Sequence, residues 1–320
     1  MNSPLRLIAG LALAALCGTA AAQTYPSKTV RMIVGYPPGG PTDLIARIVA
    51  QKLSESWGQQ VIVDNRPGAS GMIGAELTVR AAPDGYTLLM VPVTYAVTPS
   101  LYPKMSYDAA KDLAPVAQVA AAPFILVVHP TLPVKTVKEL IALARSRPGQ
   151  LNYASASTGG MPHLAGELFN TMTGVKMIHI PYKGAAPATT DLLAGQVQLM
   201  FNNMLSAMPQ VKNGRLRAIA VTSSKRSAAV PELPAIAETV PGYEASGWYA
   251  ALAPAATPRE LIAKINNDMN RIMKMPDVTQ RLAGDGVEAV GTTAEQFGIY
   301  LRSEIVKWGK VVQASGAKAD

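Results

Sequence analysis

The fold of this chain follows from one stretch, Ile33-Val34-Gly35-Tyr36-Pro37-Pro38-Gly39-Gly40-Pro41-Thr42-Asp43-Leu44-Ile45-Ala46-Arg47. It begins with two β-branched residues, continues through turn formers, and then places apolar residues at helical spacing. The stretch therefore predicts a buried strand, a turn and the start of an amphipathic helix. Gly39 and Gly40 allow left-handed backbone angles and close approaches that a Cβ would prevent.

The turn has two possible roles. The first amides of the predicted helix have no partner within the helix, so they can bind a carboxylate at the positive end of the helix dipole. A plain strand-to-helix connection, in which Thr42 or Asp43 caps the helix, explains the same residues equally well. Residues 65–71 and 155–163 repeat the design, because each is a small, polar, glycine-containing turn before a helix. Arg66 could pair with an anion there or be a solvated turn residue.

Strands alternate with helices along most of the chain, which predicts an α/β fold with mostly parallel sheets flanked by helices. Ligands of such sheets collect beyond the carboxyl ends of the strands, and the loops 36–42, 65–71 and 92–98 fit that position. Two irregular stretches, 113–123 and 231–246, are the natural crossings between two lobes. We therefore expect lobe 1 at 23–124 and 245–320, and lobe 2 at 125–244, with a cleft between them.

The N-terminal residues 1–22 are typical of a secretory signal peptide. Arg6 precedes an unbroken apolar run, Leu7 to Leu16, and Ala20-Ala21-Ala22 forms a small-residue cleavage site. The run is too short to span a bilayer as a helix. Leu16 stands where a lipoprotein needs a small residue, so lipidation of Cys17 is disfavoured. Cleavage would remove the one cysteine, and the mature chain would be thiol-free and exported to the periplasm.

The composition favours a globular protein with a small anionic ligand. The chain has 320 residues, of which 49% are hydrophobic and 16% charged, with a net charge of +8. The basic residues are scattered and not interleaved with aromatic ones, and the signal argues against a nucleic-acid partner. A positive field of this kind suits a small anion.

Enzyme signatures are scarce. Neither a nucleophile elbow nor a phosphate loop is present, and none of the three histidines has metal-ligand spacing to another His or Cys. His163 follows Ser157 by six positions, so these two residues could be interpreted as a base and a nucleophile. We therefore expect no cofactor, no metal and no catalysis.

What remains is a set of hydrogen-bond donors without a nucleophile. Donors from two lobes suit a carboxylate held between them, because each charge-assisted hydrogen bond contributes roughly 1.5–3 kcal/mol. The expected donors are the side chains of Thr42, Ser70, Thr94, Tyr95, Ser157, Thr158, Asn202 and Asn203, with free amides at Gly39-Gly40 and Gly159-Gly160.

Several motifs together resemble the Bug family, the extracytoplasmic solute receptors of tripartite tricarboxylate transporters. They are residues 36–43 (Tyr-Pro-Pro-Gly-Gly-Pro-Thr-Asp), 64–69 (Asp-Asn-Arg-Pro-Gly-Ala), 82–88 (Ala-Pro-Asp-Gly-Tyr-Thr-Leu), 181–184 (Pro-Tyr-Lys-Gly) and Trp248-Tyr249 with Ala253-Pro254. The resemblance runs from about Tyr25 to the last helix, and the combination is far more specific than any one motif.

The resemblance implies a two-lobed periplasmic binding protein fold of type II-like architecture, a carboxylate enclosed between the lobes, and docking to a membrane permease. Carried over by motif, it implies ligand contacts from Tyr36, Gly39, Thr42, Asp43 and Ser70 in one lobe and from Ser157, Thr158 and His163 in the other. Asp43 would repel an anion unless water or amides intervene, so a role at the helix start explains it as well.

One departure from the family pattern bears on the ligand. Relatives often carry an aspartate after the strand near Phe201, where this chain has Asn202-Asn203. Fewer acids favour a plain mono- or dicarboxylate, possibly an aromatic one, over a cationic or amino-acid ligand. Our hypothesis is a monomeric receptor that delivers a carboxylate to a permease. A receptor for a signalling partner and a secreted hydrolase using Ser157 and His163 are the alternatives.

Overall fold

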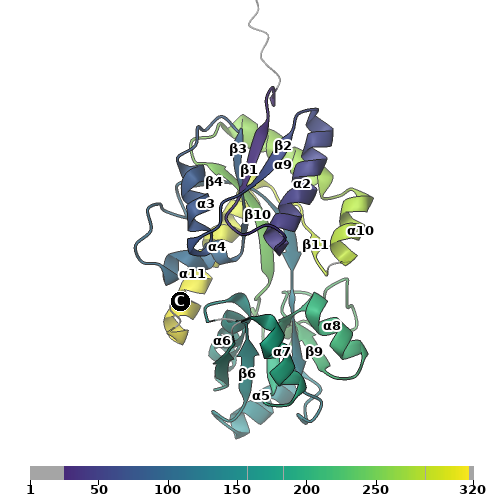
Figure 1. Ribbon diagram of the computed structural model, residues 1–320. Coiled ribbons are helices and arrows are strands. Elements are labelled where there is room, and N and C mark those ends of the chain that lie inside the picture. The colour runs from purple at the N-terminus through teal and green to yellow at the C-terminus, as the bar shows by residue number, and fades with distance from the viewer. Residues whose placement is uncertain (1–24, 157, 183, 285, 317–320) are drawn as a thin grey trace, which may run out of the picture.

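The structure, a computed structural model, describes residues 25–316 except 157, 183 and 285. Its strands form two sheets, one in each of two lobes that stack end to end (Figure 1). The first sheet has the order β11-β4-β10-β3-β1-β2 and consists of β1 (Val30–Val34), β2 (Val61–Asn65), β3 (Thr87–Pro92), β4 (Leu113–Ala122), β10 (Gly247–Pro254) and β11 (Glu288–Ala289). The second has the order β7-β6-β8-β5-β9 and consists of β5 (Phe124–Val128), β6 (Asn152–Ser155), β7 (Ile178–Pro181), β8 (Leu199–Asn203) and β9 (Arg217–Val221).

Both sheets are mixed, which corrects the expectation of mostly parallel strands. In the first sheet β1 is parallel to β2 and β3, whereas β10 is antiparallel to β3 and β4, and β11 is antiparallel to β4. In the second sheet β6 is parallel to β7 and β8, whereas β5 is antiparallel to β8 and β9. The antiparallel strands β4, β5, β9 and β10 are the ones next to the two crossings of the chain between the sheets. The alternation of strands and helices in the sequence does not reveal this direction of pairing.

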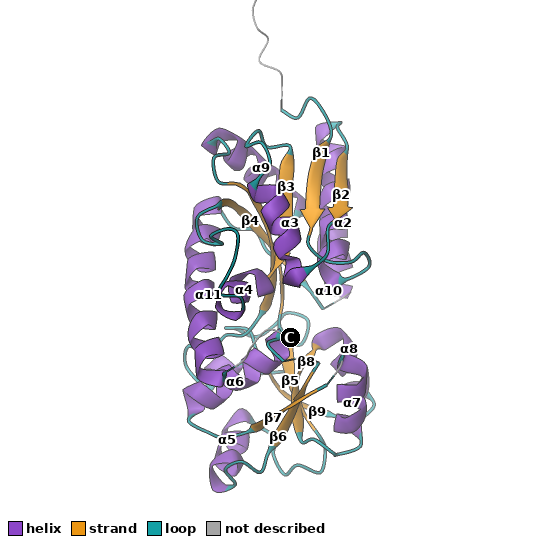
Figure 2. Cartoon of the chain, turned by 60° about the vertical axis from the view of Figure 1, so that its left-hand side comes forward, coloured by secondary structure: helices purple, strands orange, loops and turns teal. Residues whose placement is uncertain are grey.

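Helices cover the sheets on both faces (Figure 2). Those of the first lobe are α2 (Pro41–Trp57), α3 (Met72–Val79) with the short η1 (Ala69–Gly71), α4 (Thr94–Leu101), α9 (Arg259–Ile272), α10 (Pro276–Gly284) and α11 (Ala294–Ser315). Those of the second are α5 (Val137–Ser146), α6 (Met161–Thr173), α7 (Ala185–Leu193) and α8 (Met204–Lys212), and η2 (Ile236–Glu238) lies before β10.

Strand β1 shows how the core of the first lobe is built. Val30, Met32 and Val34 share one cluster with apolar residues of α2, α9 and α10, while Ile33 belongs to a second cluster with residues of α3, α4 and α11. All four side chains are fully buried. A strand buried on both faces needs a continuous apolar run, and the sequence Val-Arg-Met-Ile-Val supplies one with a single interruption.

Three elements differ from the sequence-based expectation. Residues 92–98, expected as a loop, include the start of α4, a helix that contains Pro99 and packs against α11. The stretch 113–123, expected to be irregular, contains β4, in which Pro115 lies at a register shift against β10. Tertiary packing outweighs the low helix propensity of the first segment and the low strand propensity of the second. In β4 the proline is tolerated because the pairing with β10 is already interrupted there. Helix α10 was not expected at all.

The chain passes between the sheets over short distances. Strand β4 ends at Ala122 and β5 begins at Phe124, so Pro123 alone separates strands of different sheets. The return runs through residues 222–246. Helix α11 packs on α4 and β4 and also on α6 of the other lobe, and it runs along one side of both lobes (Figure 2).

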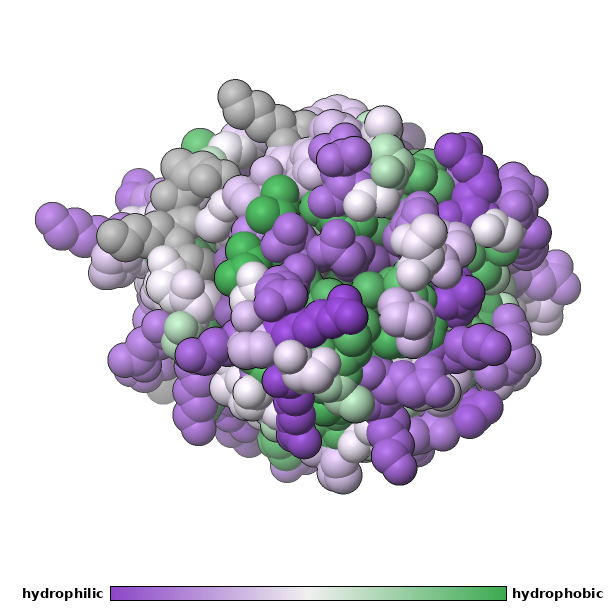
Figure 3. Space-filling view, turned by 90° about the horizontal axis from the view of Figure 1, so that it is seen from below, coloured by the Kyte–Doolittle hydropathy of each residue, from purple (hydrophilic) through white to green (hydrophobic). Residues whose placement is uncertain are grey.

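The outer end of the second lobe is of mixed character. Hydrophilic residues form most of the margin of this face, and apolar residues show between them toward its centre (Figure 3). Within the part of the chain that the structure describes, no helix has the length and apolar character needed to cross a membrane.

Candidate functional site

The parallel strands of the two lobes end where the lobes face one another. Val34 at the end of β1 pairs with Asn65 of β2 and Met90 of β3, so the segments that follow these strands leave the same edge of the sheet. In the second lobe β6 ends at Ser155 and continues into the turn before α6. The expected ligand edge of each sheet is therefore present.

Glycines bring the first two turns of lobe 1 into backbone contact. A Cβ on Gly35 would lie 2.7 Å from both Cα and the carbonyl oxygen of Gly71, and one on Gly74 would lie 2.9 Å from Cα of Gly35. Neither position has room for a side chain. These glycines serve the approach of one loop to another, whereas the close approach predicted from the sequence concerned Gly39 and Gly40.

The turn before α2 is held by a hydrogen bond to a residue of α2 itself. Gly39 has a φ of +82° and donates its amide hydrogen to Oδ2 of Asp43 at 2.9 Å. Arg47 donates to the same oxygen at 2.8 Å, and Asn65 donates to Oδ1 at 2.9 Å. Burial opposes ionisation of Asp43, but these hydrogen bonds outweigh it and hold its pKa below the usual value. Asp43 is thus a buried, paired residue of the helix start.

The turn before α6 has the same construction. Gly159 has a φ of +74° and donates its amide hydrogen to Nδ1 of His163 at 3.0 Å. The His163 ring stacks on His179 with 3.8 Å between centroids, and Nε2 of His179 lies 2.6 Å from Oγ of Ser155. Burial lowers the pKa of both histidines to about 4, so both rings are neutral at pH 7.

These contacts correct one expectation. The amides of Gly39 and Gly159 were predicted to be free for a ligand, but both donate within the protein. The residues Gly40 and Gly160 precede the helices as extended N-cap residues without a side-chain cap. The expectation of a free amide therefore fails at Gly39 and at Gly159.

A polar cavity of about 310 Å³ lies between the two turn systems. It is lined by Tyr36, Ser70, Thr94, Val97, Thr98, Leu101 and Tyr102 from the first lobe and by Thr158, Gly159 and Gly160 from the second. The volume is near the lower end for small-molecule sites, which span about 300–1,000 Å³. The cavity thus brings together four predicted residues, Tyr36, Ser70, Thr94 and Thr158, with the Gly159-Gly160 turn.

Hydroxyl groups form a connected network on the lobe 1 side of the cavity. The Tyr36 hydroxyl donates to the Ser70 carbonyl oxygen at 3.1 Å and lies 2.6 Å from Oγ1 of Thr94. The Ser70 hydroxyl lies 3.0 Å from the hydroxyl of Tyr102. Burial raises the pKa of Tyr36, so its hydroxyl stays protonated and can donate. Ser70 itself has a φ of +54°, a strained angle for a residue with a side chain.

No charged side chain is among the described residues that line this cavity. An anion there would be held by hydroxyl groups, backbone amides and the dipole of α6, whose N-cap residue Gly160 lines the cavity. Arg66, four residues before the lining residue Ser70, is paired with Asp64, and Arg47 is paired with Asp43. Such an arrangement would hold an anion through hydrogen bonds and not through a paired ion.

Other predicted residues lie outside the lining of the cavity. Gly39, Gly40, Thr42, Asp43 and His163 lie in the turns and first helical turns just described, with the side chains of Thr42, Asp43 and His163 buried. Tyr95 is buried in the core and donates to the Ala109 carbonyl oxygen at 2.9 Å. Ser157 lies outside the described residues.

Asn202 is buried at the carboxyl end of β8, and its Nδ2 has no partner among the described residues. Its Oδ1 accepts from the amide of Asn203 at 2.8 Å and from Ser206 at 3.0 Å. A buried donor without a partner costs about 1–3 kcal/mol. Because β8 is parallel to β6, this donor lies at the same edge of the sheet as the Thr158 turn.

Four lining residues were not expected: Val97, Thr98, Leu101 and Tyr102. Thr94, Val97, Thr98 and Leu101 lie at helical spacing on one face of α4. A helical interpretation of 94–101 would have grouped them with Thr94, whereas the sequence analysis treated 92–98 as a loop.

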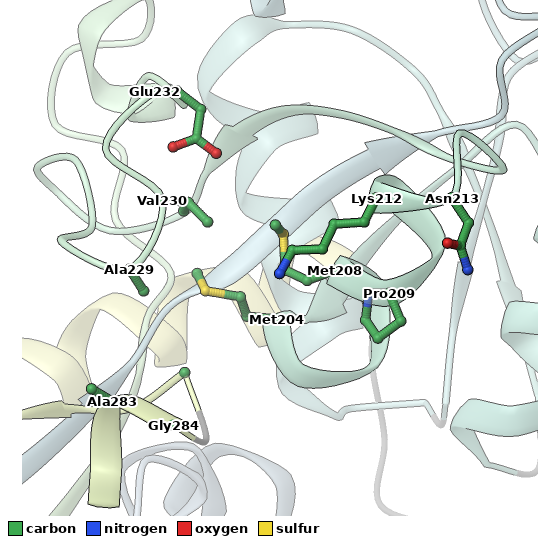
Figure 4. A pocket seen from close by; sticks show the side chains of 11 residues that line it. Met204, Met208, Pro209, Lys212, Asn213, Ala229, Val230, Glu232, Ala283 and Gly284 are labelled. Carbon is green, nitrogen blue, oxygen red and sulfur yellow. The ribbon is translucent and has the colours of Figure 1, made fainter. Parts of the chain in front are cut away.

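The cavities of about 580 and 600 Å³ elsewhere include no residue of the turns that follow β1, β2 and β6. The cavity of about 580 Å³ lies between α8, residues 229–232 and the C-terminal end of α10 (Figure 4). Met204, Met208 and Lys212 of α8 border it on one side and Ala283 and Gly284 on the other. Lys212 and Glu232, which also line it, are both exposed residues. Among the described residues, no group of three His, Cys, Asp or Glu could hold a metal ion.

A sequence profile of the tripartite tricarboxylate transporter family receptor matches residues 45–317. The chain belongs to this receptor family. Protein BugT of Bordetella pertussis is 39% identical over 311 residues, which cover 96% of this chain and 95% of BugT. The family resemblance drawn from the motifs is confirmed, and so is the expectation of a solute-binding receptor over an enzyme.

Two solved structures of such receptors are similar to this one. The R. palustris protein Rpa4515 with adipate is 38% identical, covers 92% of this chain and 99% of its own, and has a TM-score of 0.73. A TctC solute binding protein from Polaromonas with no ligand is 26% identical, covers 91% of this chain and 99% of its own, and has a TM-score of 0.84. The α/β periplasmic binding protein fold is confirmed.

Proposed function

We propose that this receptor is exported, binds an organic mono- or dicarboxylate between its lobes, and delivers it to the membrane permease of a tripartite transporter. The observation that carries the proposal is the cavity itself, where hydroxyl groups of lobe 1 meet the Thr158–Gly160 turn of lobe 2. The adipate bound to Rpa4515 supports a carboxylate as the ligand. The signal-like residues 1–22 support export to the periplasm.

The proposed lobes are 23–124 with 245–320, and 125–244. The single residue between β4 and β5 and the return to β10 support these boundaries. We infer that the lobes are open in this structure. Its TM-score is 0.84 with the Polaromonas protein, which has no ligand, and 0.73 with the adipate complex, although the adipate complex has the higher sequence identity; a more open arrangement of the lobes would explain that order. Ligand binding would then close the cleft by hinge motion.

Thermal denaturation against a panel of carboxylates tests the proposal. A ligand present at one hundred times its Kd stabilises the folded state by about 2.7 kcal/mol. We expect at least one carboxylate to raise the Tm, and hexane-1,6-diamine, matched to adipate in length but opposite in charge, to leave it unchanged. A panel in which no acid raises the Tm would refute the carboxylate assignment.

Small-angle scattering separates binding from closure. With the carboxylate that stabilises most, we expect the radius of gyration to fall as the lobes close. The same measurement reports the oligomeric state, which we propose to be monomeric. Transport itself is tested by deleting this receptor and the permease genes separately and comparing uptake of the acid.

A further inference from the structure

Helices α6 and α11, one from each proposed lobe, enclose a groove whose lining shares no residue with that of the cavity. It has a volume of about 600 Å³ and is lined by Leu168 and Thr171 of α6 and by Arg302, Ser303, Val306, Lys307, Lys310 and Val311 of α11. The apolar residues Leu168 and Val311 are buried at its base, whereas Val306 is 58% exposed. An apolar hollow of this kind is a feature of binding surfaces.

The charges around the groove have one sign. Arg302, Lys307 and Lys310 border it, and no acidic side chain is among the described residues that line it. Lys307 is paired with the buried carboxylate of Glu304, which also accepts hydrogen bonds from Trp248 and Trp308 at 2.9 Å each. Arg302 and Lys310 form no ion pair with any described residue. Two cations are therefore available to a partner.

We propose that this groove binds an acidic peptide segment of a partner protein, with an apolar side chain of the segment inserted between α6 and α11. Carboxylates of the segment would pair with Arg302 and Lys310, and the apolar side chain would cover Val306 and reach Leu168. The charges complement an acidic segment, and the hollow admits a side chain. A membrane surface fits less well, because bilayer binding needs protruding apolar side chains rather than a hollow.

The probe is a synthetic fluorescent peptide that is acidic and amphipathic, with leucines at helical spacing and glutamates elsewhere. Its control has lysine in place of every glutamate. Fluorescence anisotropy with the full mature chain measures binding, and hydrogen exchange locates it. We expect the acidic peptide to bind, the lysine peptide not to bind, and exchange to slow at residues 168–171 and 302–311.

Matched variants make the test specific. Val306→Asp and the double variant Arg302→Glu with Lys310→Glu should each weaken binding of the acidic peptide by about tenfold or more. Ile299→Asp alters an equally exposed residue of the same helix outside the groove, with 56% exposure, and Lys138→Glu reverses an exposed charge on α5. Both controls should bind as the wild type does.

Three results would overturn the proposal. The first is that the wild type and the groove variants bind the acidic peptide equally, and the second is that the peptide slows exchange elsewhere on the molecule. The third is that the peptide fails to bind, while the chain floats with phosphatidylglycerol vesicles in a way that depends on Val306. Each readout is independent of the carboxylate ligand, so a failure here leaves the proposed receptor function standing.

Discussion

Asp43 and His163 occupy equivalent positions in the two lobes. Each accepts a hydrogen bond from the amide of the glycine four residues earlier, Gly39 at 2.9 Å and Gly159 at 3.0 Å. Each glycine has a positive φ and is followed by an extended glycine that precedes a helix. One acceptor is an ionised carboxylate and the other a neutral imidazole, so the two turns should respond differently to pH.

Asp43→Ala should destabilise the protein by about 1–3 kcal/mol, because it removes the acceptor of the Gly39 amide and one of the two acceptors of the Asn65 side chain. Since the pKa of Asp43 is lowered by folding, its contribution is present above the unfolded pKa and is lost as pH falls through the folded pKa. Urea denaturation at pH 7 measures the change. The control Glu55→Gln removes an exposed carboxylate paired with Lys52 and should change stability by less than about 0.5 kcal/mol.

Acid should destabilise the protein through the stacked histidines. Folding lowers the pKa of His163 from 6.5 to about 4, so the unfolded chain binds the proton more tightly. The stability is fully present above pH 6.5 and falls as pH decreases toward 4, by an amount on the order of 3 kcal/mol. His163→Asn keeps an acceptor near Nδ1 but does not titrate. Denaturation between pH 4.5 and 7 should show a shallower pH dependence for this variant, and an unchanged slope would contradict the assignment.

Gly35→Ala should destabilise the protein by about 1–3 kcal/mol and disturb the cavity, because its Cβ would overlap the Gly71 backbone. The displaced loop carries Ser70, which borders the cavity. Gly284→Ala is the matched control, since no atom lies within 4 Å of a Cβ there and the residue ends a helix. Thermal denaturation without ligand should separate the two variants, and equal Tm values would mean that the loop yields freely.

Tyr36→Phe should weaken carboxylate binding by roughly tenfold while leaving stability nearly unchanged. The variant removes the hydroxyl shared with Ser70 and Thr94 at the cavity but keeps the ring, and one hydrogen bond to a charged group is worth about 1.5–3 kcal/mol. Calorimetric titration with the acid found in the panel measures it. Tyr86→Phe removes a hydroxyl near Ser27, far from the cavity, and should bind normally. Unchanged affinity in the Tyr36 variant would remove this residue from the site.

The sequence by itself determined the strand-turn-helix units and the two turns that face the cavity. Their signals are local, since an apolar run such as Val30–Val34 and a glycine pair before a helix act within a few residues. The family motifs were also recognised from local sequence, as were the four cavity residues Tyr36, Ser70, Thr94 and Thr158.

Only the tertiary structure decided what the polar groups of those turns bind and how the sheets are ordered. The Gly39 and Gly159 amides donate to Asp43 and His163, and the Tyr95 hydroxyl donates to a carbonyl oxygen in the core. These pairings form because a polar group that is left without a hydrogen-bond partner inside the protein is costly. Helix α4 and strand β4 exist through packing on α11 and β10 despite their prolines. Such contacts join residues far apart in the chain, so no local pattern encodes them.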